Sequence, residues 1–234
     1  FIDLGGIKQN SGSVTLSGAN NNYIGGTQIN SGILRVSTDA NLGNTAGGVI
    51  FNGGTLEAIN TFSSNRTILL TGPGTINVDP TFTLTLSGIV SGGGSLTKSN
   101  EGTLILTGAN TYTGGTTVSA GVLQGNTAGL QGSILDNATV VFDQATTGTY
   151  NGILSGSGNL IKQGAGALIL TGANIYTGGT TVSAGVLQGN TTSLQGNILD
   201  NATVMFDQAT IGTYNGILSG SGNLIKQGAG TVNF

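Results

Sequence analysis

The sequence contains no cysteine, no histidine and no tryptophan, and only two of its 234 residues are proline. Without histidine and cysteine, this segment cannot form a Ser-His-Asp triad, a cysteine nucleophile or the usual zinc ligand sets. Only 6% of the residues are charged and the net charge is −3, so there is no basic stripe to bind nucleic acid. The longest apolar runs, such as Ala167–Leu170, are far too short to span a membrane.

Glycine, in contrast, is abundant, with 44 residues, while hydrophobic residues make up 37% of the chain. Glycine does not recur at every third position, which excludes a collagen-like triple helix. Glycine, threonine, asparagine and β-branched residues dominate throughout, and these residues disfavour helices. Valine, isoleucine and leucine are placed too regularly for a flexible linker. The composition therefore predicts an all-β protein.

The strongest pattern is a long internal repeat. Residues Thr107–Gly166 recur 64 positions later as Thr171–Gly230, with six differences in 60 positions. The differences are Thr111/Ile175, Ala128/Thr192, Gly129/Ser193, Ser133/Asn197, Val141/Met205 and Thr147/Ile211. Self-similarity at a fixed period is typical of repeat architectures, in which each unit buries its apolar face against its neighbours.

A finer pattern, glycine or alanine followed two residues later by an aliphatic residue, runs through the whole chain. The aliphatic positions are Ile7, Leu34, Leu56, Ile76, Leu96, Leu123, Val140, Leu160, Leu187, Val204 and Leu224. Their average spacing suits one coil of a solenoid made of short strands and turns, about 20 residues per coil. Parallel crossovers are overwhelmingly right-handed. We therefore predict a right-handed parallel β-helix of about ten coils.

Three details of this β-helix follow from the pattern. The eleven aliphatic residues should form one stacked file in the interior, with Phe142 and Phe206 as larger plugs. Each 64-residue copy should span three whole coils, with steps of 27, 17 and 20 residues. Alternating apolar and polar residues should mark strands with one buried face, and glycine and asparagine clusters should mark the corners.

We expect residues 1–234 to be a single β-helix segment. Residues 1–36 form a first coil that carries the motif Tyr23–Thr27, residues 37–99 form interposed coils, and residues 100–166 and 167–230 hold the two near-identical copies. The chain begins at Phe1 without an initiator methionine, and it stops at Phe234, where the preceding copy continues. These features favour a fragment of a longer protein.

The stretches Gly94–Lys98 and Gly102–Leu123 carry a recognisable motif, which recurs at Asn174–Thr180 and more loosely at Asn20–Leu34. This motif resembles the passenger-associated repeat of bacterial autotransporters, the type V secretion proteins. The motif at Asn20–Leu34 departs slightly from the other occurrences, with an extra asparagine before Tyr23. The resemblance implies a secreted, extracellular passenger on the bacterial cell surface, anchored in the outer membrane through a barrel outside this segment.

Parallel β-helices also include enzymes that cut acidic polysaccharides, which need clustered carboxylates beside a lysine or arginine. The candidate residues are Asp136, Asp143 and Lys162, repeated as Asp200, Asp207 and Lys226. An active site is rarely duplicated together with its surroundings at this fidelity. We therefore favour the alternative, in which each aspartate is a solvated turn residue.

Three lysines conflict with the strand pattern. Lys98, Lys162 and Lys226 each lie two residues after an interior position, which would direct them inward if the strand continues. A buried, unpaired ammonium is costly. Either the strand turns outward at these positions, which we favour, or each lysine meets a carboxylate.

The tyrosines of the motif, Tyr23, Tyr112 and Tyr176, could anchor a sugar or protein ligand if they were exposed. We favour the alternative, in which each tyrosine covers the corner beside the glycine pair. Sequons for glycosylation occur at Asn65, Asn137, Asn190 and Asn201. We interpret them as ordinary Asn-Thr turns.

The sequence thus favours a non-enzymatic stalk or adhesive rod of an autotransporter or adhesin. We expect no catalytic residues, no cofactor, no metal ligands and no membrane insertion by this segment, and the residues that bind a partner stay unidentified. The expected partner is a host cell or neighbouring cell surface. One alternative is a structural protein that self-associates along its flanks or at its open ends, which present unpaired strand edges. The second is a polysaccharide-degrading β-helix enzyme.

Overall fold

The computed structural model describes residues 5–234, so Phe1, on which the fragment prediction partly rests, lies outside the described residues. The chain divides into two compact units. The N-terminal unit extends to Leu123 and includes Ala128–Gln131, and the C-terminal unit comprises Gln124–Thr127 and Gly132–Phe234. Strand β15 (Val122–Gly125) has residues in both.

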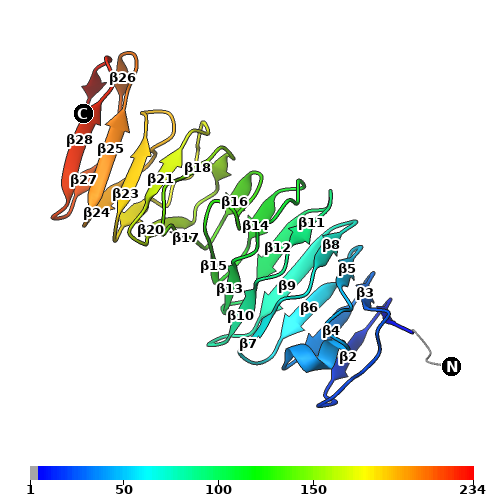
Figure 1. The fold of residues 1–234 in the computed structure, drawn as a ribbon. Coiled ribbons are helices and arrows are strands. Elements are labelled where there is room, and N and C mark those ends of the chain that lie inside the picture. Colours follow the sequence, from blue (N-terminus) through cyan, green and yellow to red (C-terminus); the bar gives the residue numbers. More distant parts are fainter. Residues whose placement is uncertain (1–4) are drawn as a thin grey trace. The chain divides into compact units, whose positions relative to one another are not determined.

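The N-terminal unit has three sheets, one on each side of its coils (Figure 1). The first sheet contains β1 (Ile7–Gln9), β3 (Thr27–Ile29), β5 (Val49–Phe51), β8 (Ile68–Leu70) and β11 (Val90–Ser91). The second contains β2 (Ser13–Leu16), β4 (Ile33–Val36), β6 (Thr55–Ala58), β9 (Gly74–Val78), β12 (Leu96–Ser99) and β14 (Thr116–Val118). The third contains β7 (Phe62–Ser64), β10 (Thr83–Leu86) and β13 (Thr103–Leu106).

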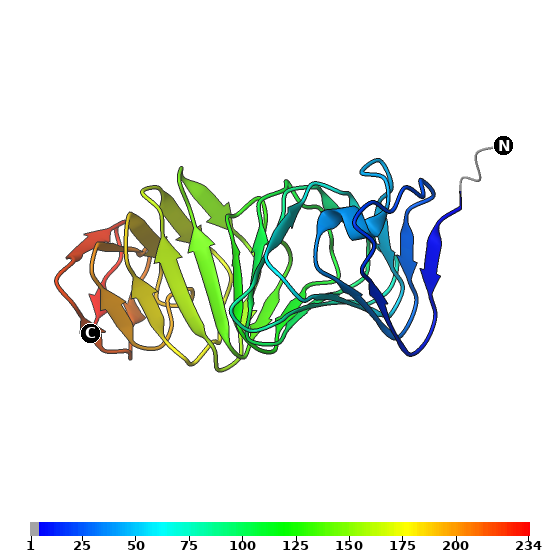
Figure 2. The same ribbon diagram turned by 90° about the horizontal axis from the view of Figure 1, so that it is seen from below.

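The C-terminal unit is also three-sided, and Figure 2 shows its yellow-to-red strands stacked in sequence order. Its first side contains β16 (Ile134–Asp136) and β19 (Leu154–Ser155). Its second contains β17 (Thr139–Asp143), β20 (Asn159–Gln163), β22 (Thr180–Val182), β24 (Ile198–Asp200) and β27 (Leu218–Ser219). Its third contains β18 (Gly148–Tyr150), β21 (Ala167–Leu170), β23 (Val186–Gly189), β25 (Thr203–Asp207) and β28 (Asn223–Gln227). β26 (Gly212–Thr213) pairs with β29 (Val232–Asn233).

Each strand pairs in parallel with a strand one coil away. Leu34 lies beside Leu56, and Leu56 lies beside Ile76, so equivalent positions are about 20 residues apart. The protein is therefore an all-β parallel β-solenoid of about 11 turns, which confirms the predicted fold class. Among the described residues the sole helical element is the short 3-10 helix η1 (Asp39–Leu42), and no α-helix occurs.

The core follows from the alternation of side chains along each strand. In β10, Leu84 and Leu86 are buried while Thr83 and Thr85 lie partly exposed on the outer face. Burying one such leucine stabilises the fold by about 1.5 to 3 kcal/mol. Phe142 and Phe206 are fully buried, which confirms their prediction as interior plugs.

The prediction of one interior file of eleven aliphatic residues is wrong. Nine of these residues are buried, whereas Ile7 is partly exposed and Leu224, in the last coil, is 50% exposed. They also lie on different sides: Leu34 is in the second sheet of its unit, whereas Ile7 is in the first. The reason is that strands on every side begin with a glycine turn followed by an aliphatic residue. The 27-residue step from Ile7 to Leu34 therefore contains one full coil, from Ile7 to its neighbour Thr27, and part of the next coil.

Candidate functional site

The repeated motif forms a loop that replaces the strand on one side of its coil. In the first copy the loop spans residues 107–115, between β13 and β14. Its backbone still bonds to the coil below, because Thr111 N donates to Val90 O and Thr113 N donates to Gly92 O. The loop therefore continues the stack without being a strand.

Asn110 joins this loop to the coil on either side of it. Its Oδ1 accepts a hydrogen bond from Val90 N at 2.7 Å, and its Nδ2 donates to Gly129 O at 2.7 Å. Its own backbone N donates to Ala128 O at 2.9 Å. The side chain is 5% exposed. A side-chain amide, with one acceptor and two donors, thus supplies bonds that a strand would have made through its backbone.

Asn174 repeats this arrangement in the second copy. Its Oδ1 accepts from Leu154 N at 2.8 Å and its Nδ2 donates to Ser193 O at 2.7 Å. Sequence reasoning missed both asparagines as key residues. The available signal was the Gly-Ala-Asn run that precedes the tyrosine in both copies.

The motif tyrosines are structural. The Tyr112 hydroxyl lies 2.9 Å from Thr116 Oγ1 and accepts a bond from Gln131 N at 3.3 Å. In the second copy the Tyr176 hydroxyl lies 2.8 Å from Thr180 Oγ1. Burial raises the pKa of both hydroxyls, and the threonine bonds offset part of this rise.

Tyr112 and Tyr176 are only 2% and 3% exposed, which confirms that they cover the corner and excludes them as exposed ligand anchors. Tyr23 is partly exposed and its hydroxyl bonds Thr27 Oγ1 at 2.8 Å, so it makes the same threonine contact.

The glycine pair that follows each tyrosine is required by close packing. A Cβ at Gly114 would collide with the backbone of Gly94 in the coil below, and Gly115 has a φ of +75°. A side chain at either position would be strained, because one lacks space and the other is in the left-handed region.

The lysines follow neither of the two predicted alternatives. Lys98 and Lys162 point inward and are completely buried. Lys98 Nζ donates to the carbonyl oxygens of Ser99 at 2.9 Å, Asn100 at 2.6 Å and Ala120 at 3.1 Å. Three backbone carbonyls, one of them from the next coil, therefore take the place of the expected carboxylate. Burial lowers the pKa of Lys98 to about 8, against an opposing effect of nearby Glu101.

Lys162 has the same partners, with its Nζ donating to Gln163 O, Gly164 O and Ala184 O at 2.7 to 3.0 Å. Lys226, in the last coil, is exposed and donates to Gln227 O and Gly228 O.

The acidic candidates do not form a catalytic cluster. In β17 and β20, Phe142 pairs with Lys162 while Asp143 pairs with Gln163. Lys162 is therefore on the inner face of the sheet and Asp143 is on the outer face. Asp143 Oδ2 accepts bonds from the amides of Gln124 and Gln163, in the coils on either side.

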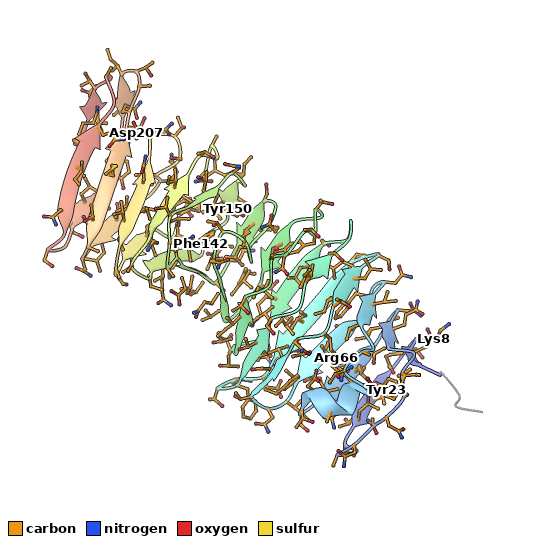
Figure 3. The ribbon with its side chains drawn as sticks, viewed as in Figure 1. Lys8, Tyr23, Arg66, Phe142, Tyr150 and Asp207 are labelled. Carbon is orange, nitrogen blue, oxygen red and sulfur yellow. The ribbon has the colours of Figure 1, made fainter. Side chains whose placement is uncertain are left out.

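Asp207 in the second copy, labelled in Figure 3, is held in the same way by Gln188 and Gln227. Asp143 and Asp207 therefore lie on the outer face, as the interpretation requires, but each is the last residue of a strand (β17 and β25) and not a turn residue.

Asp136 and Asp200 are not solvated turn residues, which corrects the prediction. They are 3% and 6% exposed. Oδ1 of Asp136 accepts a bond from Ala138 N at 3.0 Å, and Asp200 does the same with Ala202 N at 2.9 Å. Burial raises the pKa of Asp136 to about 6, although the backbone N–H groups of Ala138 and Val140 act against the rise.

A buried arginine, Arg66, holds a loop in the N-terminal unit. Arg66 Nε donates to Asp39 Oδ1 at 2.8 Å, and its terminal nitrogens donate to the carbonyls of Gly43 at 2.7 Å and Gly47 at 2.9 Å. These groups belong to the segment around η1, and Figure 3 shows Arg66 and Tyr23 close together there. Sequence reasoning missed Arg66, whose only signal was its position among six basic residues.

At the sequons, Asn190 Oδ1 accepts bonds from Thr192 N at 2.9 Å and Ser193 N at 3.0 Å. Asn190 is therefore a turn residue, as predicted. Asn65, Asn137 and Asn201 lie exposed on the surface.

Within residues 5–234, no three acidic residues gather closely enough to hold a metal ion. Over the same residues, no helix has the length and apolar character needed to cross a bilayer.

Comparison with known proteins identifies the motif. The passenger-associated-transport-repeat family matches residues 7–36, 96–124 and 160–188, the segments that contain the three motif loops. The chain is 43% identical over 184 residues to the adhesin BmaC autotransporter of Brucella suis, a match that covers 77% of this chain and 5% of that protein. It is 34% identical over 150 residues to the 16S rRNA endonuclease CdiA of Enterobacter cloacae, covering 59% of this chain and 4% of that protein.

The chain therefore spans about a twentieth of the length of the curated relatives it matches. No solved structure matches it.

Proposed function

Because the chain carries three passenger-associated transport repeats and is homologous to an autotransporter adhesin, we propose that it is a non-enzymatic stalk segment of a surface-displayed passenger. Its task is to hold a binding element away from the cell envelope. The 16S rRNA endonuclease activity in the name of the second relative stays with that protein, of which 4% is matched.

The observation that carries this proposal is the use of the motif's polar side chains. Asn110, Tyr112 and Lys98 each bond to a neighbouring coil, as do Asn174 and Lys162 in the second copy. A motif whose buried polar groups link coil to coil supports a role in building the stack. In a solenoid each repeat contacts its neighbours alone, so an array of such motifs can extend to any length.

The proposal is tested in the full-length protein displayed on cells. We delete residues 161–180, which form one coil because Leu160 and Thr180 are neighbours in the stack. A stalk should keep its adhesion within about twofold, since each remaining coil still stacks on an equivalent neighbour. The control is the amount of intact protein on the surface, measured with an antibody against a terminal tag.

Abolished adhesion at unchanged surface amount would contradict the stalk role and make these coils the adhesive surface. The enzyme alternative is tested in parallel by measuring sugar release from acidic polysaccharides. We expect no release from the parent protein. Release that disappears in the double variant Asp143→Asn, Asp207→Asn would overturn the non-enzymatic assignment.

A further inference from the structure

The 64-residue copy does not contain a whole number of coils. In the C-terminal unit, Leu160 lies beside Thr180, Thr180 lies beside Ile198, and Ile198 lies beside Leu218. These four residues occupy the same side in four successive coils. Three coils above Leu160 the chain has therefore reached Leu218.

The residue that corresponds to Leu160 in sequence, 64 positions later, is Leu224. Leu224 lies in β28, the strand after β27, and pairs with Val204. Val204 in turn pairs with Leu187, and Leu187 with Leu168, so this file is on the third side of the unit. One copy thus consists of three coils plus one further side. This corrects the prediction that a copy spans three whole coils.

The coil from Thr180 to Ile198 has 18 residues, whereas the coils before and after it have 20, so three coils are six residues shorter than one copy. The step of six residues from Leu218 to Leu224 crosses one corner into the next strand, β28, and is therefore the length of one side.

We infer that each 64-residue copy rotates everything beyond it by about a third of a turn around the solenoid axis, since the coils are three-sided. Copy number therefore sets direction as well as length, and three copies restore the original direction. Ile175, which is 68% exposed, lies in the motif loop of the second copy and corresponds to Thr111 in the first. This loop position should point to a different side of the solenoid in each successive copy. The inference concerns geometry and does not depend on the stalk role.

The test compares three chains by pulsed electron paramagnetic resonance. Because the protein has no cysteine, spin labels attach only at introduced positions. The reference label is at Thr103→Cys on the outer face of β13. A second label is placed in turn at Thr213→Cys, Ser219→Cys or Ile225→Cys, one on each side near the C-terminal end. The three distances show which side faces the reference.

The chains are the parent, a variant lacking residues 108–171, and a control lacking residues 161–180. The 64-residue deletion joins Thr107 to Gly172, so the sequence across the join is unchanged. We expect the label nearest the reference to move forward by one strand, from Ser219, whose strand β27 is in the same sheet as β13, to Ile225 in β28. The one-coil control should leave the same label nearest, because it removes one complete coil.

The inference is overturned if the same label stays nearest after the 64-residue deletion, as it would for whole coils. It is also overturned if both deletions move the nearest label equally. Circular dichroism and melting of each labelled chain establish that it is folded. Should the 64-residue deletion not fold, the matched insertion of a second Gly108–Thr171 after Thr171 should move the nearest label backward by one strand.

Discussion

Phe142 and Tyr150 meet edge to face inside the C-terminal unit, with ring centroids 4.9 Å apart and ring planes at 65° (Figure 3). The second copy repeats this pair as Phe206 and Tyr214, at 5.1 Å and 68°. Both phenylalanines are fully buried.

Replacing Phe142 with alanine should lower the free energy of unfolding by about 3 to 5 kcal/mol, because it opens a cavity in a packed core. Phe142→Leu should cost clearly less, since it keeps most of the apolar volume. Urea unfolding followed by circular dichroism measures both. Equal effects of the two substitutions would show that the ring pair contributes no packing of its own.

Replacing Asn110 with alanine should lower the free energy of unfolding by about 2 kcal/mol or more, because it removes buried bonds to Val90 N and Gly129 O. The matched control is Thr111→Ala at the exposed neighbouring position, which should change it by less than about 0.5 kcal/mol. Similar unfolding midpoints for the two variants would contradict the bridging role of the amide.

Much of the fold could be predicted from the sequence, because alternation in segments such as Thr83–Leu86 shows which side chains face inward. The sequence could not predict on which side of the coil each strand lies, because strands on all three sides begin with similar glycine turns. The pattern therefore placed Ile7 and Leu34 in one file although they are in different sheets.

The site was predicted less completely for a related reason. The family motif and the structural role of Tyr112 could be derived from residue types. The three carbonyl groups that bond Lys98 could not be derived in this way, because the direction of a backbone oxygen depends on the path of the chain and not on residue type. The inward lysine looked costly in sequence and is satisfied in the structure.

Replacing Leu160 with aspartate should unfold the stack locally, because Leu160 is 2% exposed and an unpaired buried carboxylate costs several kcal/mol. Asp143→Asn should change the free energy of unfolding by less than about 0.5 kcal/mol, since an asparagine oxygen can still accept from Gln124 and Gln163. Thermal melts rank the two variants. The opposite ranking would assign Asp143 a role that its contacts do not explain.

Asp136 should make stability depend on mild acid. Its folded pKa is about 6 and its ordinary value is 3.8, so the folded state binds more protons between these values. The contribution of this group therefore stabilises the fold below about pH 4 and is lost as the pH rises through 6. Unfolding free energies of the parent and of Asp136→Asn, measured from pH 4 to 7, should differ most in slope in this window. Parallel curves would contradict the raised pKa.

We propose that the repeated motif holds coils together and does not hold a ligand. The most direct test measures both cell adhesion and the folded fraction of the surface-displayed protein and compares the two. The variants are Asn110→Ala, Asn174→Ala and, at an exposed position, Ile175→Thr. The account predicts that adhesion falls only in step with folding for the two asparagine variants and is unchanged for Ile175→Thr. Abolished adhesion in any of the three, with the folded fraction intact, would contradict it.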